Sequence, residues 1–335
     1  MMRVLVLGAL PPPIGGVSIH IDRFLDYCWE NDSENSIVAF DIKKRRLFTK
    51  EGNYGFLSGF VFFIKCNIVH IHISSNLKLF AALIAKLLRK HVVYTHHNSI
   101  VSNRRIFGAL FRICDAVILV NSEEVFKSLP SLNFSRKIFS IPAFIAKDCS
   151  GLIPSVIEDQ VKQADTVFST NCYSASVIGD EEVYGISRLV DVFKKGAQHG
   201  LLHGSLLIIC DPSASFKDSF QGRFLFELEG GNRILYWSKP LDFLSVIKIS
   251  TATIRATITD GDSLSVRESL HLGVPVIASD CVRRPDGSVL YRTADNDDLL
   301  DNIVNLARGK VSVDFVQKSY ADDVLALYRK LTGLR

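Results

Sequence analysis

The chain lacks the sequence features of secreted, disulfide-stabilised or membrane-spanning proteins. Its seven cysteines among 335 residues are scattered, with no C-x-x-C pair and no spacing typical of metal ligands. This predicts free thiols in a reducing cytoplasm. The apolar stretch VLVLGAL near the start is too short for a secretory signal and runs directly into three prolines. Residues 56–64 are too few to cross a bilayer, and Lys65 follows them.

A glycine fingerprint for dinucleotides is also missing. Gly8 ends the first apolar stretch and Asp41 ends the second, where a dinucleotide site has its phosphate-binding glycine and its ribose-binding acid. However, residues 10–13 read LPPP, and proline has no N–H to donate to a pyrophosphate. The sequence therefore disfavours a dinucleotide-binding protein.

What the sequence does contain is a globular composition, 47% hydrophobic and 22% charged, with unevenly distributed charge. Residues 1–150 hold 19 Lys and Arg against 11 Asp and Glu, whereas residues 151–335 hold 20 against 24. A basic half beside an acidic half suggests that the first half meets an anionic partner.

Apolar strands alternate with amphipathic helices along most of the chain. The expected strands of the first half cover 3–8, 36–40, 67–73, 91–95, 116–120 and 137–141, and the alternation restarts at 166. Such alternation predicts parallel, doubly wound sheets. We expect an N-terminal Rossmann-like domain at 1–148, a linker of weak periodicity at 149–165 and a second Rossmann-like domain at 166–318. A last helix is expected at 315–331, with residues 319–335 returning to the first domain.

The stretch 254–280, IRATITDGDSLSVRESLHLGVPVIASD, reads as a buried strand, a polar loop, a short helix and a second strand. A strand that leads into a helix N-terminus forms an anion site, because the first N–H groups of the helix have no partner within it. Asp260 and Glu268 bracket this turn, with seven residues between them. The pattern acidic-x7-Glu followed by GVPVIAS resembles the signature of the family 4 retaining glycosyltransferases of the GT-B fold. That family usually has Glu at both ends, so Asp260 is a departure.

The resemblance implies a GT-B fold, in which two Rossmann-like, doubly wound α/β domains face each other across a cleft. It also implies a UDP- or GDP-linked sugar donor and no separate cofactor or metal. In that family the second acid holds the ribose hydroxyls, and the first contacts the sugar as a catalytic residue. A carboxylate suits both tasks because it accepts two hydroxyl hydrogen bonds. The donor-binding residues expected on this basis are Gly15, Gly16, Asn171, Tyr184, Gly261, Asp262, Ser263, Leu264, Ser265, Arg267 and Glu268.

Two other interpretations of this stretch compete with sugar-nucleotide binding. Residues 265–268 have the S-x-x-E spacing of a capping box, in which Glu268 would only cap its helix. Residues 260–262 spell D-x-D, which holds a divalent metal in another class of glycosyltransferase. No histidine or carboxylate partner is evident nearby in the sequence, so we do not expect a metal site here.

Glycine and histidine residues after two early strands are further candidates. Gly15 and Gly16 let the backbone approach a ligand closely. The GGxxxH stretch that ends at His20 resembles a stretch that lines the cleft in the family, which implies that His20 binds the acceptor.

The histidines at 96 and 97 follow a strand, at the carboxyl end where open α/β sheets bind ligands. The family's T-x-H pattern, matched by Thr95 to His97, implies that His97 is the catalytic residue beside the transferred sugar. His70 and His72 alternate within the strand NIVHIHI and are expected to be structural.

The cations that usually clamp a donor diphosphate are not at their usual places. The family commonly has an Arg early in the second domain and a Lys before a glycine. Here no Arg lies near Asn171, and Tyr184 precedes Gly185. Either the clamp is rebuilt, with help from the helix N-terminus, or the donor binds weakly or not at all. The candidate replacements are Arg188, Arg255 and Arg267, of which the last is best placed by sequence.

Basic runs lie at 43–46, 89–90 and 104–105, the last followed by the apolar run IFGALF. A solvated surface explains such runs as well as an interface does. The functional interpretation is that the first domain docks peripherally on the inner face of the membrane and reaches a polyprenyl-diphosphate-linked acceptor. Nucleic acid is not expected, because aromatic residues are not interleaved with the basic ones.

The resemblance implies transfer of a hexosyl or N-acetylhexosaminyl group to a hydroxyl of a lipid-linked saccharide, with retention, in the synthesis of a surface polysaccharide such as lipopolysaccharide or capsule. Attack is expected on the front face of the sugar, with the leaving diphosphate helping to take the acceptor proton. One alternative is a GT-B-like sugar-nucleotide epimerase, which would not respond to an acceptor. Another is a non-catalytic partner subunit, which would bind no nucleotide.

Overall fold

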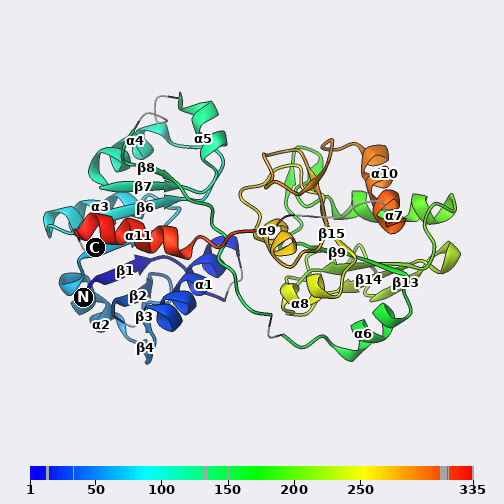
Figure 1. The fold of residues 1–335 in the computed structure, drawn as a ribbon, viewed down its shortest axis with the longest axis horizontal. Helices are drawn as coiled ribbons and strands as arrows, with labels where there is room; N and C mark the ends of the chain where they lie inside the picture. The colour runs from blue at the N-terminus through cyan, green and yellow to red at the C-terminus, as the bar shows by residue number, and fades with distance from the viewer. Residues whose placement is uncertain are drawn as a thin grey trace. The chain divides into compact units, whose positions relative to one another are not determined.

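The computed structural model divides the chain into two compact units, each built on a mostly parallel sheet (Figure 1). Unit 1 comprises Met1–Lys147 and Ser319–Arg335, and unit 2 comprises Asp148–Lys318. The structure describes residues 1–12, 15–32, 34–130, 135–149, 151–309, 315 and 317–333. Residue 316 of the helix expected at 315–331 lies outside these ranges, as do residues 150 and 310–314 of the expected domain segments.

Unit 1 contains an eight-stranded sheet in the order β4-β3-β2-β1-β5-β6-β7-β8. The strands pair in parallel except at one edge, where β3 runs antiparallel to both β2 and β4; the sequence pattern did not indicate this edge hairpin. Their bounds are β1 Arg3–Leu7, β2 Ser36–Asp41, β3 Arg46–Thr49, β4 Gly52–Tyr54, β5 Ile68–Ile71, β6 His91–His96, β7 Ala116–Leu119 and β8 Ile138–Ser140.

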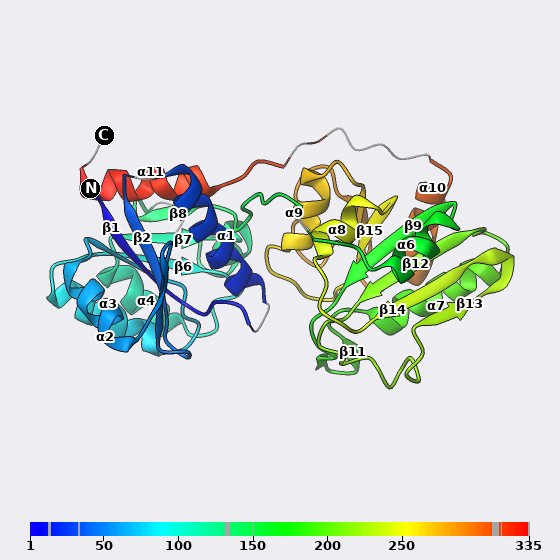
Figure 2. The same ribbon diagram turned by 90° about the horizontal axis from the view of Figure 1, so that it is seen from below.

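Helices cover both faces of this sheet, because successive strand residues point to opposite sides. Val4 and Val6 of β1 pack into a core with α1 (Gly16–Asn31) and α11 (Ala321–Thr332). Leu5 and Leu7 belong to a second core on the other face. The helices of that face are α2 Phe56–Lys65, α3 Leu77–Leu87, α4 Arg104–Ile113 and α5 Ser122–Ser128. Figure 2 separates the two layers, with α11 and α1 on one side of the strands and α2, α3 and α4 on the other.

Helix α4 contains the apolar run IFGALF that follows the basic pair 104–105, and the helix uses this run to pack on the sheet. Phe107 and Leu110 are buried in the core beneath the helix, and the Phe107 ring contacts that of Tyr94 on β6. The helical period places residues 107 and 110 on one face, so the run IFGALF covers the sheet.

The last helix begins at Ala321, six residues later than expected. Before it, the N–H of Tyr320 donates to the carbonyl of Phe144, and the N–H of Ala146 donates to Oγ of Ser319. These bonds hold the incoming chain against residues 144–146 of unit 1, so helix formation starts only after Tyr320. Tyr328 of α11 is then fully buried, with its ring against Phe24 of α1.

Unit 2 contains a seven-stranded sheet in the order β13-β14-β12-β9-β15-β16-β17, parallel except for the edge strand β13. Helices again cover both faces: α7 and α10 share one core with the sheet, and α6, α8 and α9 lie on the other face. A two-stranded ribbon, β10 Val177–Ile178 and β11 Glu181–Glu182, precedes α7. The remaining bounds are β9 Thr166–Asn171, β12 Ser205–Cys210, β13 Leu225–Glu227, β14 Arg233–Trp237, β15 Ala252–Arg255, β16 Val276–Ser279, β17 Val289–Tyr291, α6 Ser155–Lys162, α7 Ile186–Gln198, α8 Phe243–Lys248, α9 Leu264–His271 and α10 Asn296–Ala307.

Helix α6 lies within the segment 149–165, where we expected a linker. Its Ile157 is fully buried beside Val167 and Val246 of unit 2. The helix is only eight residues long and exposes most of its surface. A single buried anchor gives little periodicity, which is why the sequence pattern did not indicate it.

The buried hydroxyl of Tyr328 supplies a test of how firmly α11 belongs to unit 1. It pairs with Nδ1 of His70, and within the described part of the chain that atom also lies 3.3 Å from Nε2 of His72. Tyr328→Phe should lower the free energy of unfolding by about 1–2 kcal/mol, because the buried imidazole nitrogen loses its partner.

The matched control is Tyr27→Phe, which removes a hydroxyl that joins α1 to Asp322 of α11 at the surface. This change should cost less than about 0.5 kcal/mol in urea unfolding. Equal losses for the two variants would contradict the anchoring role of Tyr328.

Candidate functional site

Each sheet reverses its strand order at one central strand. In unit 1, β1 lies between β2 and β5; in unit 2, β9 lies between β12 and β15. Ligands of open α/β sheets bind outside the carboxyl ends of the strands at such a reversal, because the loops there diverge to opposite faces. A candidate site residue should therefore lie at the carboxyl end of the strands beside β1 or beside β9.

Four histidines gather at the reversal of unit 1. His20 comes from α1, His70 and His72 from β5 and its end, and His97 from the end of β6. Nδ1 of His72 lies 2.8 Å from Nε2 of His97, and the ring centre of His20 is 5.4 Å from each of theirs. The structure thus brings His20 together with His97, as both expected roles require.

His70 and His72 belong to this cluster as well, although we expected them to be structural. Nε2 of His70 is 2.7 Å from Oγ1 of Thr95, and its ring lies 4.1 Å from that of His72. The signal was present in the sequence: residues i and i+2 of a strand share a face, and a histidine at each predicts a cluster there. His96, by contrast, points to the other face, against Tyr94 and Phe107.

The cluster is electrically neutral near pH 7. Burial lowers the pKa of His20 to about 4 and that of His70 to about 3. Burial and the neighbouring imidazoles hold the pKa values of His72 and His97 well below 6.5. The site can therefore donate and accept hydrogen bonds, as sugar hydroxyls require, without carrying charge.

Gly15 and Gly16 are not required by the packing of the protein itself. Gly15 has an extended backbone with φ −160°, and a Cβ atom there would approach only Oγ of Ser18, at 3.9 Å. A Cβ at Gly16 would meet no atom of the described residues within 4 Å. Gly8 differs, because a Cβ there would lie 2.3 Å from Cδ1 of Ile21. The open space at residues 15 and 16 is where a ligand could approach the start of α1.

Asp41 binds backbone groups of its own turn and of the loop after β1. Its carboxylate accepts hydrogen bonds from the N–H groups of Leu10, Lys43 and Lys44. The residue therefore fixes the turn between β2 and β3, and the ribose-binding role of the dinucleotide alternative is not supported.

In unit 2, Asp260 follows β15 and anchors two arginines. Its carboxylate accepts from Nε and Nη2 of Arg255 at 2.9 and 3.1 Å and from Nη1 of Arg284 at 2.8 Å. It also accepts from the N–H of Gly261 and the hydroxyl of Thr257. Burial alone would raise the pKa of Asp260, but the two guanidinium groups outweigh it and lower the pKa to about 2.

These bonds change how the sequence-derived role of Asp260 must be understood. The expected role was direct contact with the sugar, whereas the carboxylate oxygens here are occupied by protein donors. Arg284, which sequence reasoning missed, follows β16 in no recognisable motif. Its side chain is 2% exposed, so only the folded structure reveals its place.

A positive charge does lie beside Tyr184, the residue that stands where the resemblance led us to look for a lysine. The guanidinium of Arg255 is 5.1 Å from the ring centre of Tyr184, a cation–π contact. Tyr184 precedes Gly185, which has φ 60° and is the N-cap residue of α7; a Cβ at Gly185 would lie 2.4 Å from the carbonyl oxygen of Ala256. The start of α7 is thus held tightly against the end of β15, with Arg255 between Tyr184 and Asp260.

The other two candidate cations are paired with acids. Nε of Arg267 is 2.5 Å from Oδ1 of Asp262, and both side chains are largely buried. Nη2 of Arg188 donates to Glu181 at 2.9 Å. Arg267, which the sequence favoured, is therefore largely neutralised within its own loop.

Glu268 is not a helix cap. Helix α9 begins at Leu264 with Ser263 as its N-cap residue, which places Glu268 at the fifth helical position. A capping box needs the acid at the third position, so that interpretation is wrong. Glu268 is 6% exposed, on a helix whose N-terminus follows the loop of residues 260–263 at the end of β15. Gly261 and Leu264 lie in the same loop and first turn, and Asn171 ends the neighbouring β9.

The neutral histidines predict a loss of stability in mild acid. Their pKa values in the folded state lie below 6.5, so the unfolded chain takes up protons first as the pH falls below that value. The free energy of unfolding should fall between pH 6.5 and about 4, by about 1.4 kcal/mol per pH unit for each such histidine.

Urea unfolding at a series of pH values measures this slope. His72→Asn should reduce it by about one proton, whereas His199→Gln, at an exposed position, should leave it unchanged. Asp260 acts in a different window, because a lowered carboxyl pKa loses its contribution only as the pH falls below 3.8. Stability that is flat between pH 7 and pH 5 would contradict the neutral cluster.

Asp260→Asn should destabilise unit 2 strongly. The change leaves two buried guanidinium groups without their counter-charge, which costs about 3 kcal/mol in the free energy of unfolding. Asp297→Asn is the control, because it breaks only a surface pair with Lys195 and should leave the free energy of unfolding almost unchanged. Equal small losses would show that the Asp260 cluster contributes nothing to folding.

No family model matches the chain, and no curated protein sequence matches it. Solved structures do match over almost its whole length. HepE from Anabaena in complex with UDP has 13% identity and a TM-score of 0.61, over 98% of this chain and 95% of the other. The lipopolysaccharide outer core galactosyltransferase WaaB has 15% identity and a TM-score of 0.59, over 98% of this chain and all of the other.

A putative UDP-N-acetylglucosamine 2-epimerase from Listeria monocytogenes also matches, with 12% identity and a TM-score of 0.58, over 99% of this chain and 97% of the other. At these identities the likeness concerns the arrangement of the chain. The two α/β units, with sheets of eight and seven strands, have the GT-B fold.

Proposed function

We propose that this protein is a glycosyltransferase that moves a sugar from a nucleotide-sugar donor to a hydroxyl of a saccharide acceptor, with retention at the anomeric carbon. The observation that carries the proposal is Glu268: a glutamate buried inside α9, not used as a cap, on a helix that starts at the end of β15. A carboxylate beside this loop could accept hydrogen bonds from both hydroxyls of a ribose in bidentate form.

The loop and first turn of α9 would take the donor diphosphate. The N–H groups of residues 262–265 lie at a helix N-terminus, where anions are stabilised. Arg255 would supply the cation that Tyr184 does not, because it lies on the Tyr184 ring at the end of β15. Asp260 then acts as a positioning residue that fixes Arg255, and Asn171 borders the same place from β9.

The neutral histidines of unit 1 would bind the transferred sugar and the acceptor. A neutral His97 suits a hydrogen bond to a hydroxyl of the transferred sugar, and His20 with Gly15 and Gly16 suits the acceptor. Retention with front-face attack needs positioning and charge stabilisation more than a nucleophile, and the leaving diphosphate would help to take the acceptor proton. The fold likeness to HepE, solved with UDP and with UDP-glucose, supports a uridine nucleotide in the donor.

The acceptor is proposed to be a saccharide on a lipid carrier, used in surface polysaccharide synthesis. The basic first half of the chain and the likeness to a lipopolysaccharide galactosyltransferase support it. A second candidate, a sugar-nucleotide epimerase, is favoured by the likeness to the Listeria protein. An epimerase would convert the donor at the same rate with and without saccharide acceptors.

Thermal unfolding of the full chain with UDP, GDP, ADP or NADH tests the donor site. A nucleoside diphosphate at a hundredfold excess over its Kd should raise the Tm by about 5 °C, since it binds only the folded state. Glu268→Gln should lower the affinity at least tenfold by removing the charge that accepts both ribose hydroxyls, and so abolish most of the shift.

The control is Glu227→Gln, at an exposed glutamate of β13, which should leave the shift unchanged. A shift with NADH alone would favour the dinucleotide alternative. If no nucleotide stabilises the wild-type chain, the glycosyltransferase proposal fails and a non-catalytic role becomes the better account.

A further inference from the structure

Helices α2 and α3 of unit 1 expose apolar side chains on their outer sides, the reverse of an ordinary surface helix. Leu57 is 77% exposed, Phe80 64% and Leu87 81%. The exposed apolar residues of the two helices and the residue that follows α3 are Phe56, Leu57, Phe60, Val61, Ile64, Leu77, Phe80, Leu83, Ile84, Leu87 and Leu88. We call this set the α2–α3 face.

The exposed apolar residues of each helix form a continuous stripe. In α2 they recur at 56, 60 and 64 with 57 and 61 beside them, and in α3 at 77, 80, 84 and 87. Such spacing places side chains on one side of a helix. Both helices pack on the same face of the sheet, and Figure 2 shows them on the same side of the strands. Exposed apolar surface of this kind marks a contact with a partner or a membrane.

The positive charge around the α2–α3 face indicates an anionic partner. Residues 52–114 contain eight Lys and Arg and no Asp or Glu. Lys65 ends α2, and Arg89 and Lys90 follow α3, so the cations gather where both helices end. A segment of this length with one sign of charge fits an anionic surface, and apolar stripes bordered by cations are the pattern of helices that lie in a membrane interface.

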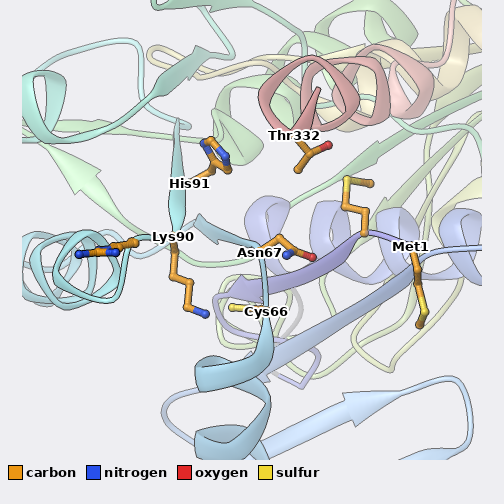
Figure 3. Close-up of a pocket in the computed structure, with 8 residues that line it drawn as sticks. Met1, Cys66, Asn67, Lys90, His91 and Thr332 are labelled. Atoms are coloured by element: carbon orange, nitrogen blue, oxygen red, sulfur yellow. The ribbon is translucent and has the colours of Figure 1, made fainter. Parts of the chain in front are cut away.

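A basic pocket adjoins the same end of the face. It has a volume of about 360 Å³ and lies at the amino ends of β5 and β6 (Figure 3). Arg89, Lys90, His91 and Asn67 line it, and Nζ of Lys90 donates to the carbonyl of Ile64 at the end of α2. The pocket is at the opposite end of the sheet from the histidine cluster, so it is separate from the candidate sugar site. A phosphate of a lipid headgroup matches its donors.

We propose that the α2–α3 face docks unit 1 on a bilayer that contains anionic lipids, with the apolar stripes in the interface and headgroup phosphates at the basic end. Among the described residues no helix is long and apolar enough to cross a membrane, so the contact would lie on the bilayer surface. A second copy of the chain is a poorer occupant, because a twofold interface would place the same positive residues opposite each other. The proposal does not depend on glycosyl transfer.

Flotation of the full chain with lipid vesicles tests this surface without any nucleotide. The probes are vesicles of phosphatidylcholine alone and of equal parts phosphatidylcholine and phosphatidylglycerol. The wild-type chain should float with the mixed vesicles at least tenfold more strongly than with the neutral ones, and salt should weaken this binding.

Two variants separate the apolar from the charged contribution. Leu57→Ser with Phe60→Ser should lower the partition coefficient at least tenfold on mixed vesicles, since two apolar side chains no longer enter the interface. Lys65→Glu with Arg89→Glu should lower it at least tenfold at low salt. All four side chains are exposed, so the Tm of each variant should equal that of the wild type.

Matched controls change the same chemistry on unit 2. Leu152→Ser with Leu290→Ser removes two exposed apolar side chains there, and Lys194→Glu with Lys248→Glu makes the same change in net charge. Both should bind vesicles like the wild type. Equal losses for test and control variants, or no binding of the wild type to mixed vesicles, would overturn the proposal. A dimer in sedimentation that Leu57→Ser with Phe60→Ser disperses would assign the face to a second copy instead.

Discussion

The reversal of strand order beside β1 and beside β9 is the constraint on which both candidate sites depend. Two parallel neighbouring strands are joined by a crossover helix. Where two such connections leave for opposite faces of the sheet, the carboxyl ends of the strands between them are left uncovered. In unit 1 this geometry collects histidines from α1, β5 and β6, residues up to 77 positions apart in the chain. In unit 2 the same geometry brings Tyr184, which precedes α7, beside Arg255 at the end of β15.

The candidate sites of unit 1 and unit 2 differ in charge because burial affects an imidazole and a guanidinium differently. An imidazole with no acid beside it loses its proton when it is buried, which keeps the histidine cluster neutral. A guanidinium retains its charge and instead requires a counter-ion, which Asp260 supplies to Arg255 and Arg284. Two arginines on one carboxylate leave an excess positive charge at the end of β15, whereas the cluster of unit 1 offers only polar contacts.

Much of this arrangement could be predicted from the sequence, because strand alternation and the Asp260–Glu268 spacing are local patterns. The strands at 3–7 and 91–96 lie where the sequence indicated them, and His97 lies near His20. The sequence pattern could not predict which side chains pair with each other. Whether Arg267 is free to meet a phosphate depends on Asp262, and Arg284 reaches Asp260 across 24 residues of chain. Such pairs are fixed by packing of separate segments and leave no local pattern.

The α2–α3 face illustrates the same limit from the opposite direction. Length and hydropathy correctly indicated that residues 56–64 cannot span a bilayer, but they could not say which helix faces solvent. The two apolar runs at 56–64 and 106–111 look alike in sequence. In the folded chain the second buries Phe107 and Leu110 in the core, while the first leaves Phe56, Phe60 and Ile64 outside it. Helix α2 packs beside the edge hairpin and buries little of its surface, so its apolar stripe is in excess of what the core can cover. An apolar stripe that the fold does not use has a cost in solubility, and a partner surface is the physical reason for a protein to retain it.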